Sequence, residues 1–134
     1  MFFLLYNRAT YDELTMELDR AFPMAEITAK QHANLFDLPY LTAVINEGLR
    51  FGAAFPGWPR TVPKEGVVLE GRYIPGGTVV SVPSYAQQMN PDNFWPDTKI
   101  FRPERWLKDG LGPNTVTRQA ANMSFQFGMF QNTS

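Results

Sequence analysis

Glu47 and Arg50 are the residues whose types and spacing best suit chemistry between charges. They lie three positions apart in LPYLTAVINEGLRF, residues 38–51, and side chains three apart on a helix are near enough to touch. A guanidinium and a carboxylate at that distance form charge-assisted hydrogen bonds. Taken alone, the stretch favours a solvated surface pair that contributes about 0.2–0.5 kcal/mol.

The composition excludes several other kinds of site. The 134 residues contain no cysteine, which excludes disulfide partners, thiolate metal sites and cysteine nucleophiles. His32 is the single histidine, so the residues predict neither a usual zinc site nor a serine–histidine pair. Twelve basic and thirteen acidic side chains leave the net charge near zero, and no basic stripe indicates nucleic acid. The length and the 44% hydrophobic content predict one ordinary folded domain.

The charged pair requires a helix, which we expect from Pro39 to Arg50. Proline suits a first helical turn because its missing N–H would be unpaired there, and Gly52 is placed to end the helix. Apolar residues recur at spacings of three and four, which predicts one apolar face made of Leu41, Val44, Ile45 and Leu49. Glu47 and Arg50 are expected on the opposite side.

A second helix is expected from Thr10 to Phe22. Thr10 and Glu13 have the spacing of a capping box. Apolar residues then recur with a helical period, namely Tyr11, Leu14, Leu18 and Phe22. The preceding MFFLLY is a six-residue apolar run, far short of the ~20 residues of a membrane span. It is more typical of the tail of a longer helix.

Short strands are predicted in the next part of the chain. Val67–Leu69 and Arg72–Ile74 flank Glu70-Gly71, the pattern of a hairpin with a two-residue turn. Thr78 to Val82 is rich in β-branched residues, which favours a third strand in the same small sheet. These elements predict an α+β fold.

Irregular structure is expected after one further helical turn. Ser84 to Met89 fits that turn. From Asn90 to Leu107 the chain is aromatic and interrupted by prolines, with neither a helical nor a strand period. Its backbone groups still need partners, so it is expected to lie against another part of the fold.

Four motifs together resemble one protein family. They are Glu47–Arg50 (EGLR), Tyr73–Gly77 (YIPGG), Val82–Ala86 (VPSYA) and Phe101–Trp106 (FRPERW). In this order they resemble the cytochrome P450 family, the haem-thiolate monooxygenases, and look most like members from filamentous fungi. The resemblance covers nearly the whole chain, from Tyr11 to Met129.

The resemblance implies a fold and a structural cluster. Residues 1–134 would be part of a P450 domain from its C-terminal half: the end of the I helix, the J and K helices, a small β-sheet and the meander. Glu47 and Arg50 would belong to the K helix and Arg105 to the meander. In the family these three positions form a buried charge cluster, which displaces the surface-pair interpretation.

The resemblance also implies two sets of binding residues. Arg60 is placed where the family positions an arginine on a haem propionate; the alternative is an exposed loop arginine. Phe55, Pro56, Gly57 and Trp58 would line the substrate cavity, with ordinary core packing as the alternative.

The sequence departs from the family where the iron ligand is expected. Family members read Phe-Gly-x-Gly-x-Arg-x-Cys there, and Phe127–Met129 begins that motif. Phe130, Asn132 and Ser134 then replace the second glycine, the arginine and the cysteine. A register that starts at Phe125 puts Phe130 at the arginine and Asn132 at the cysteine, so neither register supplies a thiolate. The break suggests a shifted reading frame, a missed splice junction or a truncated gene.

Two functions from different classes follow. In the first, the chain is a piece of a monooxygenase whose full-length form uses haem, oxygen and a reductase to oxidise a small organic molecule. In the second, it is a non-catalytic remnant or a small binding protein without haem. The absent cysteine favours an inactive chain that binds no haem by itself. Full-length relatives are usually anchored at the endoplasmic reticulum, and this chain shows no anchor.

Overall fold

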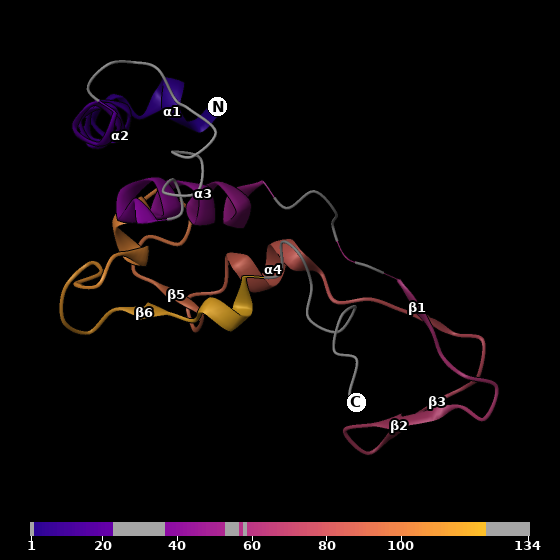
Figure 1. Ribbon diagram of the computed structural model, residues 1–134. Coiled ribbons are helices and arrows are strands. Elements are labelled where there is room, and N and C mark those ends of the chain that lie inside the picture. Colours follow the sequence, from indigo (N-terminus) through magenta and orange to yellow (C-terminus); the bar gives the residue numbers. More distant parts are fainter. Residues whose placement is uncertain (1, 23–36, 53–56, 58, 123–134) are drawn as a thin grey trace.

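The computed structural model describes residues 2–22, 37–52, 57 and 59–122. Helices α1 (Phe2–Tyr6) and α2 (Arg8–Ala21) lie on one side of α3 (Pro39–Phe51). Two later strands, β5 (Phe94–Trp95) and β6 (Val116–Thr117), lie on the other side. The strands β1 (Arg60–Thr61), β2 (Val67–Leu69) and β3 (Arg72–Ile74) extend away from the helices (Figure 1). No helix in the described part of the chain is long and apolar enough to cross a bilayer.

The start of α2 differs from the sequence prediction. The helix begins at Arg8 with Asn7 as its N-cap residue, and no side chain caps it. The predicted capping box is therefore wrong, because Thr10 lies inside the helix and is buried. The side-chain amide of Asn7 instead donates from Nδ2 to the Phe3 carbonyl at 2.7 Å. A longer α2 thus follows α1 almost without a break.

The bounds of α3 agree with the prediction, but its buried face does not. The helix has Leu38 and Gly52 as its cap residues. Ile45, predicted to face the core, is 49% exposed, whereas Glu47 and Arg50 are fully buried. The buried residues themselves recur at spacings of three and four: Tyr40, Ala43, Val44, Glu47 and Arg50. The hydrophobic pattern did not predict the burial of Glu47 and Arg50, because charged side chains can be buried when they are paired with each other.

Within the described residues, the strands form three separate antiparallel pairs rather than one sheet. In the hairpin, β2 (Val67–Leu69) pairs with β3 (Arg72–Ile74). Both turn residues have positive φ, 47° for Glu70 and 77° for Gly71, as a tight hairpin turn requires. The third predicted strand is reduced to β4 (Val79–Val80).

The other two pairs join segments that are distant in sequence. β4 pairs with β1 (Arg60–Thr61) instead of extending the hairpin. β5 (Phe94–Trp95) pairs with β6 (Val116–Thr117). The sequence did not predict β1, β5 or β6, because a two-residue strand has no measurable period.

The rest of the chain between α4 and β6 is largely irregular, as predicted. α4 (Ser84–Gln88) forms the expected helical turn. Between Asn90 and Leu107, the structure has β5 and a four-residue 3-10 helix, η2 (Pro103–Trp106). This stretch is therefore not a continuous helix, and η2 packs against α3.

An aromatic and aliphatic core holds α1, α2 and α3 to the irregular stretch. Its buried members are Leu14, Tyr40, Val44 and Phe101. The Phe3 ring from α1 stacks on Phe101, with ring centroids 5.2 Å apart. The core therefore fixes the position of α3 relative to residues 101–107.

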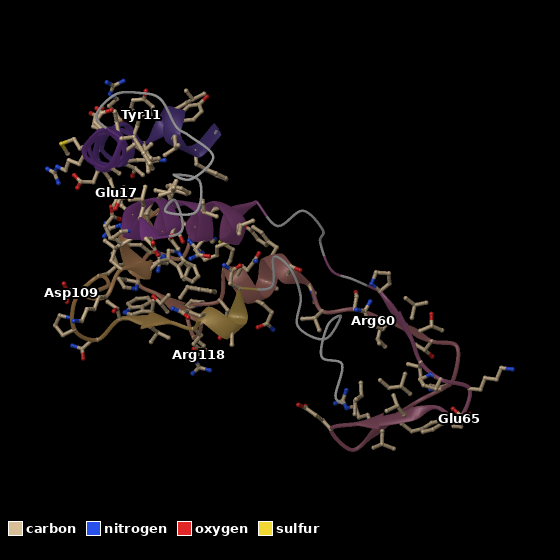
Figure 2. The ribbon with its side chains drawn as sticks, viewed as in Figure 1. Tyr11, Glu17, Arg60, Glu65, Asp109 and Arg118 are labelled. Atoms are coloured by element: carbon tan, nitrogen blue, oxygen red, sulfur yellow. The ribbon has the colours of Figure 1, made fainter. Side chains whose placement is uncertain are left out.

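Glu17 of α2 provides a second link to α3. One of its carboxylate oxygens accepts from the Tyr40 amide at 2.9 Å and the other from the Leu41 amide at 2.8 Å. These amides lie in the first turn of α3, which Leu38 does not cap with its own side chain. Figure 2 shows Glu17 on the side of α2 that faces α3, opposite Tyr11. A neighbouring helix thus supplies the cap.

We expect Glu17→Ala to lower the free energy of unfolding by about 1 kcal/mol, the usual cost of a lost N-terminal cap. Glu17→Gln should cost less because its amide oxygen can still accept one hydrogen bond. Urea unfolding followed by tryptophan fluorescence measures both. The matched control is Glu13→Ala, at an exposed position of the same helix. Equal stabilities of Glu17→Ala and Glu13→Ala would contradict the cap.

Candidate functional site

Glu47 is the centre of a buried charge cluster. It lies on α3 with Arg50, while Arg105 comes from η2. All three charged side chains are 0% exposed. The structure therefore brings together the three charged residues that the sequence singled out.

The Glu47 carboxylate accepts from both arginines. Arg50 binds it through two parallel hydrogen bonds, Nε to Oε2 and Nη2 to Oε1, each 2.8 Å long. Arg105 donates from Nε to Oε1 at 3.1 Å. The backbone amide of Arg102 adds a bond to Oε1 at 2.9 Å. This paired fork geometry is specific to arginine, and lysine could not reproduce it.

The remaining guanidinium donors are bound by backbone carbonyls. Arg50 donates from Nη1 to the carbonyls of Gln88 at 2.8 Å and Thr98 at 2.7 Å. Arg105 donates from Nη2 to Pro96 at 3.2 Å and to Asp97 at 3.1 Å. Two side chains therefore supply donors for a stretch of backbone without regular secondary structure.

The charges in the cluster support one another. Burial by itself raises the pKa of Glu47, but hydrogen bonds from Arg50 and the Arg102 amide, with the charges of Arg50 and Arg105, outweigh it. The pKa of Glu47 is therefore below its ordinary value. Burial lowers the pKa of Arg105, and the charge of Glu47 opposes that effect. An arginine stays protonated under ordinary conditions, so one anion faces two cations at neutral pH.

Tyr40 provides a further polar link between α3 and η2. Its hydroxyl donates to Glu104 Oε1 at 3.0 Å. Burial, followed by this hydrogen bond, raises the pKa of Tyr40 to about 12. Tyr40 is therefore a neutral donor over the whole physiological range.

The other residues singled out in the sequence lie elsewhere. Arg60 is exposed on β1 and donates to the Pro59 carbonyl at 3.4 Å. Figure 2 shows it on the strands that extend beyond α3. Gly57 is half-buried, and a Cβ added there would lie 2.6 Å from the Val82 carbonyl oxygen. Phe55, Pro56 and Trp58 lie outside the described residues.

Sequence reasoning missed one side chain of the cluster. Trp106 donates from Nε1 to Glu47 Oε2 at 2.9 Å. Its position directly after Arg105, within the FRPERW motif, was the available signal. Among the described residues, no group of three or more histidines, cysteines or carboxylates could hold a metal ion.

Comparison with known protein families shows to which family the chain belongs. The family model described as cytochrome P450 matches residues 1–129. The chain belongs to the cytochrome P450 family. This confirms the resemblance found in the sequence, and the helices with small antiparallel strand pairs are those of an α+β fragment of a P450.

Fungal P450s are among the similar proteins. Cytochrome P450 monooxygenase ankB of Aspergillus thermomutatus is 43% identical over 110 residues, which cover 81% of this chain and 20% of that protein. Pisatin demethylase of Fusarium vanettenii is 40% identical over 112 residues, 81% of this chain and 21% of its own length. Cytochrome P450 monooxygenase lnbC of Aspergillus flavus is 36% identical over 126 residues, 92% of this chain and 24% of its own. The chain spans a fifth to a quarter of these P450 relatives.

Proposed function

We propose that this chain forms the part of a P450 monooxygenase core in which a buried charge cluster fixes irregular backbone. In this assignment α1 is the end of the I helix, α2 the J helix and α3 the K helix, and residues 90–107 are the meander. The observation that carries the proposal is the Glu47 carboxylate, which accepts from Arg50 of α3 and Arg105 of η2. The cluster therefore acts through structure, and none of its three charged residues is assigned a catalytic role.

The whole protein is proposed to oxidise a small organic molecule with haem, oxygen and electrons from a reductase. The relatives support this class of reaction, since their names describe monooxygenases and a demethylase. The substrate and the position oxidised depend on residues outside the matched segment as well. Phe55, Pro56, Gly57 and Trp58 are the residues of this chain proposed to line the substrate cavity.

The residues present fit one part of a haem and not another. The exposed Arg60 guanidinium suits a propionate carboxylate, because the two form charge-assisted hydrogen bonds. The iron is different: a P450 requires a cysteine thiolate on it, and the 134 residues contain no cysteine. Bound haem would supply oxygen activation in the whole enzyme. Arg60 is therefore the residue proposed to bind a propionate, and the chain offers no thiolate for the iron.

We expect the polypeptide of residues 1–134, expressed alone and mixed with haem, to show no thiolate-bound P450 spectrum and no turnover. The reasons are the absent cysteine and the fact that the chain covers about a quarter or less of its relatives. The measurement is the difference spectrum of the reduced chain with carbon monoxide. A Soret peak characteristic of thiolate-bound haem would contradict the proposal.

Two variants sharpen this experiment. His32→Ala removes the single imidazole, so loss of a different, imidazole-like spectrum in this variant would identify adventitious haem. Ser134→Cys places a thiol where one register of the haem motif expects it. We expect no thiolate spectrum from this variant either, because one ligand does not replace the rest of a P450. A thiolate peak would show instead that the ligand was the only missing part.

A further inference from the structure

The Glu47 carboxylate has a third side-chain donor besides its two arginines. Trp106 Nε1 donates to Oε2 at 2.9 Å. The same oxygen accepts one other bond, from Arg50 Nε at 2.8 Å. Oε1, in contrast, accepts from Arg50, Arg105 and the Arg102 amide. Without Trp106, a buried carboxylate oxygen would therefore keep a single donor.

A neutral donor suits this position. The two buried arginines and Glu47 already leave one net positive charge inside the protein. A third cation would add to that charge and to its cost of desolvation. An indole N–H donates a hydrogen bond without adding charge. Trp106 can thus satisfy the oxygen where a lysine or arginine would be unfavourable.

The indole ring is itself held in place by packing. Its centroid lies 5.9 Å from that of Phe94, with the two rings tilted by 52°. Phe94 is fully buried, and the Arg50 guanidinium lies 5.2 Å from its ring centroid. A phenylalanine at position 106 could retain much of this ring contact but could not donate to Glu47.

We propose that Trp106 is a positioning residue of the charge cluster, whose indole N–H fixes the carboxylate of Glu47 so that Oε1 faces Arg105 and the Arg102 amide. This role is separate from the proposed function of the whole protein, because it needs no haem. It can therefore be tested on the polypeptide of residues 1–134.

The test compares Trp106→Phe with Trp95→Phe, a matched control at a 52% exposed position on β5. A hydrogen bond to a charged group is strong, so we expect Trp106→Phe to raise the unfolding equilibrium constant at neutral pH at least about tenfold more than the control. Urea unfolding followed by circular dichroism measures it. Equal effects of the two substitutions would overturn the proposal.

The acid side of the stability profile separates a hydrogen bond from simple packing. The charged groups that face Glu47 are Arg50 of its own helix and Arg105 of η2, with Asp97 acting on Arg105. A lowered pKa means that the stabilisation by Glu47 is present above the unfolded-state pKa and is lost as pH falls through the folded-state pKa. Loss of one donor raises the folded-state pKa. The loss of stability caused by Trp106→Phe should therefore shrink as pH falls through the folded-state pKa of Glu47, whereas lost packing alone would lower the stability equally at every pH. A loss of stability that does not change with pH would contradict the hydrogen bond.

A measurement on the unmodified chain covers the case in which Trp106→Phe does not fold. Nuclear magnetic resonance gives one indole N–H signal for each of the three tryptophans, and Trp58→Phe and Trp95→Phe identify the signal of Trp106 by elimination. We expect this proton to exchange with solvent at least about tenfold more slowly than that of Trp95. Exchange at the same rate would overturn the proposal.

Discussion

Glu47→Gln is expected to lower the free energy of unfolding by about 3–5 kcal/mol, the cost of leaving buried charges without their partner. The substitution keeps the size of the side chain but removes the anion between Arg50 and Arg105. It also directs an amide N–H₂ group toward donors that require an acceptor. Urea unfolding at neutral pH measures the change.

The control for Glu47→Gln is Glu65→Gln, at an exposed position in the turn before β2. Surface substitutions of this kind usually change stability by less than about 0.5 kcal/mol. If Glu47→Gln abolishes the cooperative transition, Arg105→Lys provides a milder change, because it keeps the charge and loses the planar fork. Stability of Glu47→Gln within about 0.5 kcal/mol of the control would show that the cluster does not hold the fold together.

Phe94→Ala is expected to cost about 3–5 kcal/mol, as for other large aromatic side chains removed from a core. Phe94 is fully buried and contacts both the Trp106 ring and the Arg50 guanidinium. Its removal leaves a cavity beside the charge cluster, where collapse of the surroundings would disturb the hydrogen bonds of Arg50. Thermal and urea unfolding both measure the loss.

Phe94→Leu is the informative companion because it restores most of the volume without the aromatic ring. We expect it to cost less than half as much as Phe94→Ala, with the remainder due to the lost ring contacts. Trp95→Phe, next in the chain and largely exposed, serves as the control. If Phe94→Ala cost less than about 1 kcal/mol, Phe94 would not be part of the core.

The limits of α3 were predictable because they depend on local chemistry. Pro39 fits the first turn and Gly52 the end of the helix, and both act through their own backbone. The hairpin turn at Glu70-Gly71 was predictable for the same reason, because Gly71 adopts a positive φ, 77°, that other residues disfavour. Signals contained in two or three adjacent residues are reliable because they do not depend on tertiary contacts.

The buried face of α3 was not predictable from periodicity. Hydrophobic pattern treats Glu47 and Arg50 as surface residues, while tertiary partners from residues 88–106 bury them. The Thr10 capping box failed similarly. Thr10 is drawn into the interior of α2, where its side chain lies beside the Tyr40 hydroxyl.

Pairing across long stretches was also beyond the sequence signal. β5 and β6 each contain two residues and are separated by twenty others, residues 96–115. The role of Glu17 was equally hidden, since a carboxylate on an amphipathic helix ordinarily faces solvent. Its partners are backbone amides of another helix. Because every residue except proline has such an amide, the sequence does not indicate which ones Glu17 binds.

Because Arg50 and Arg105 bind backbone carbonyls, the path of the irregular stretch depends little on the side chains within it. Every residue type has the same carbonyl oxygen, so the hydrogen bonds to Thr98, Pro96 and Asp97 do not involve the side chains of these residues. The backbone path of this segment is therefore determined mainly by the two arginines that bind it. The exposed side chains of Lys99 and Ile100 could therefore be replaced while the backbone keeps its path, whereas a single substitution of Arg50 would remove the hydrogen bonds that hold it.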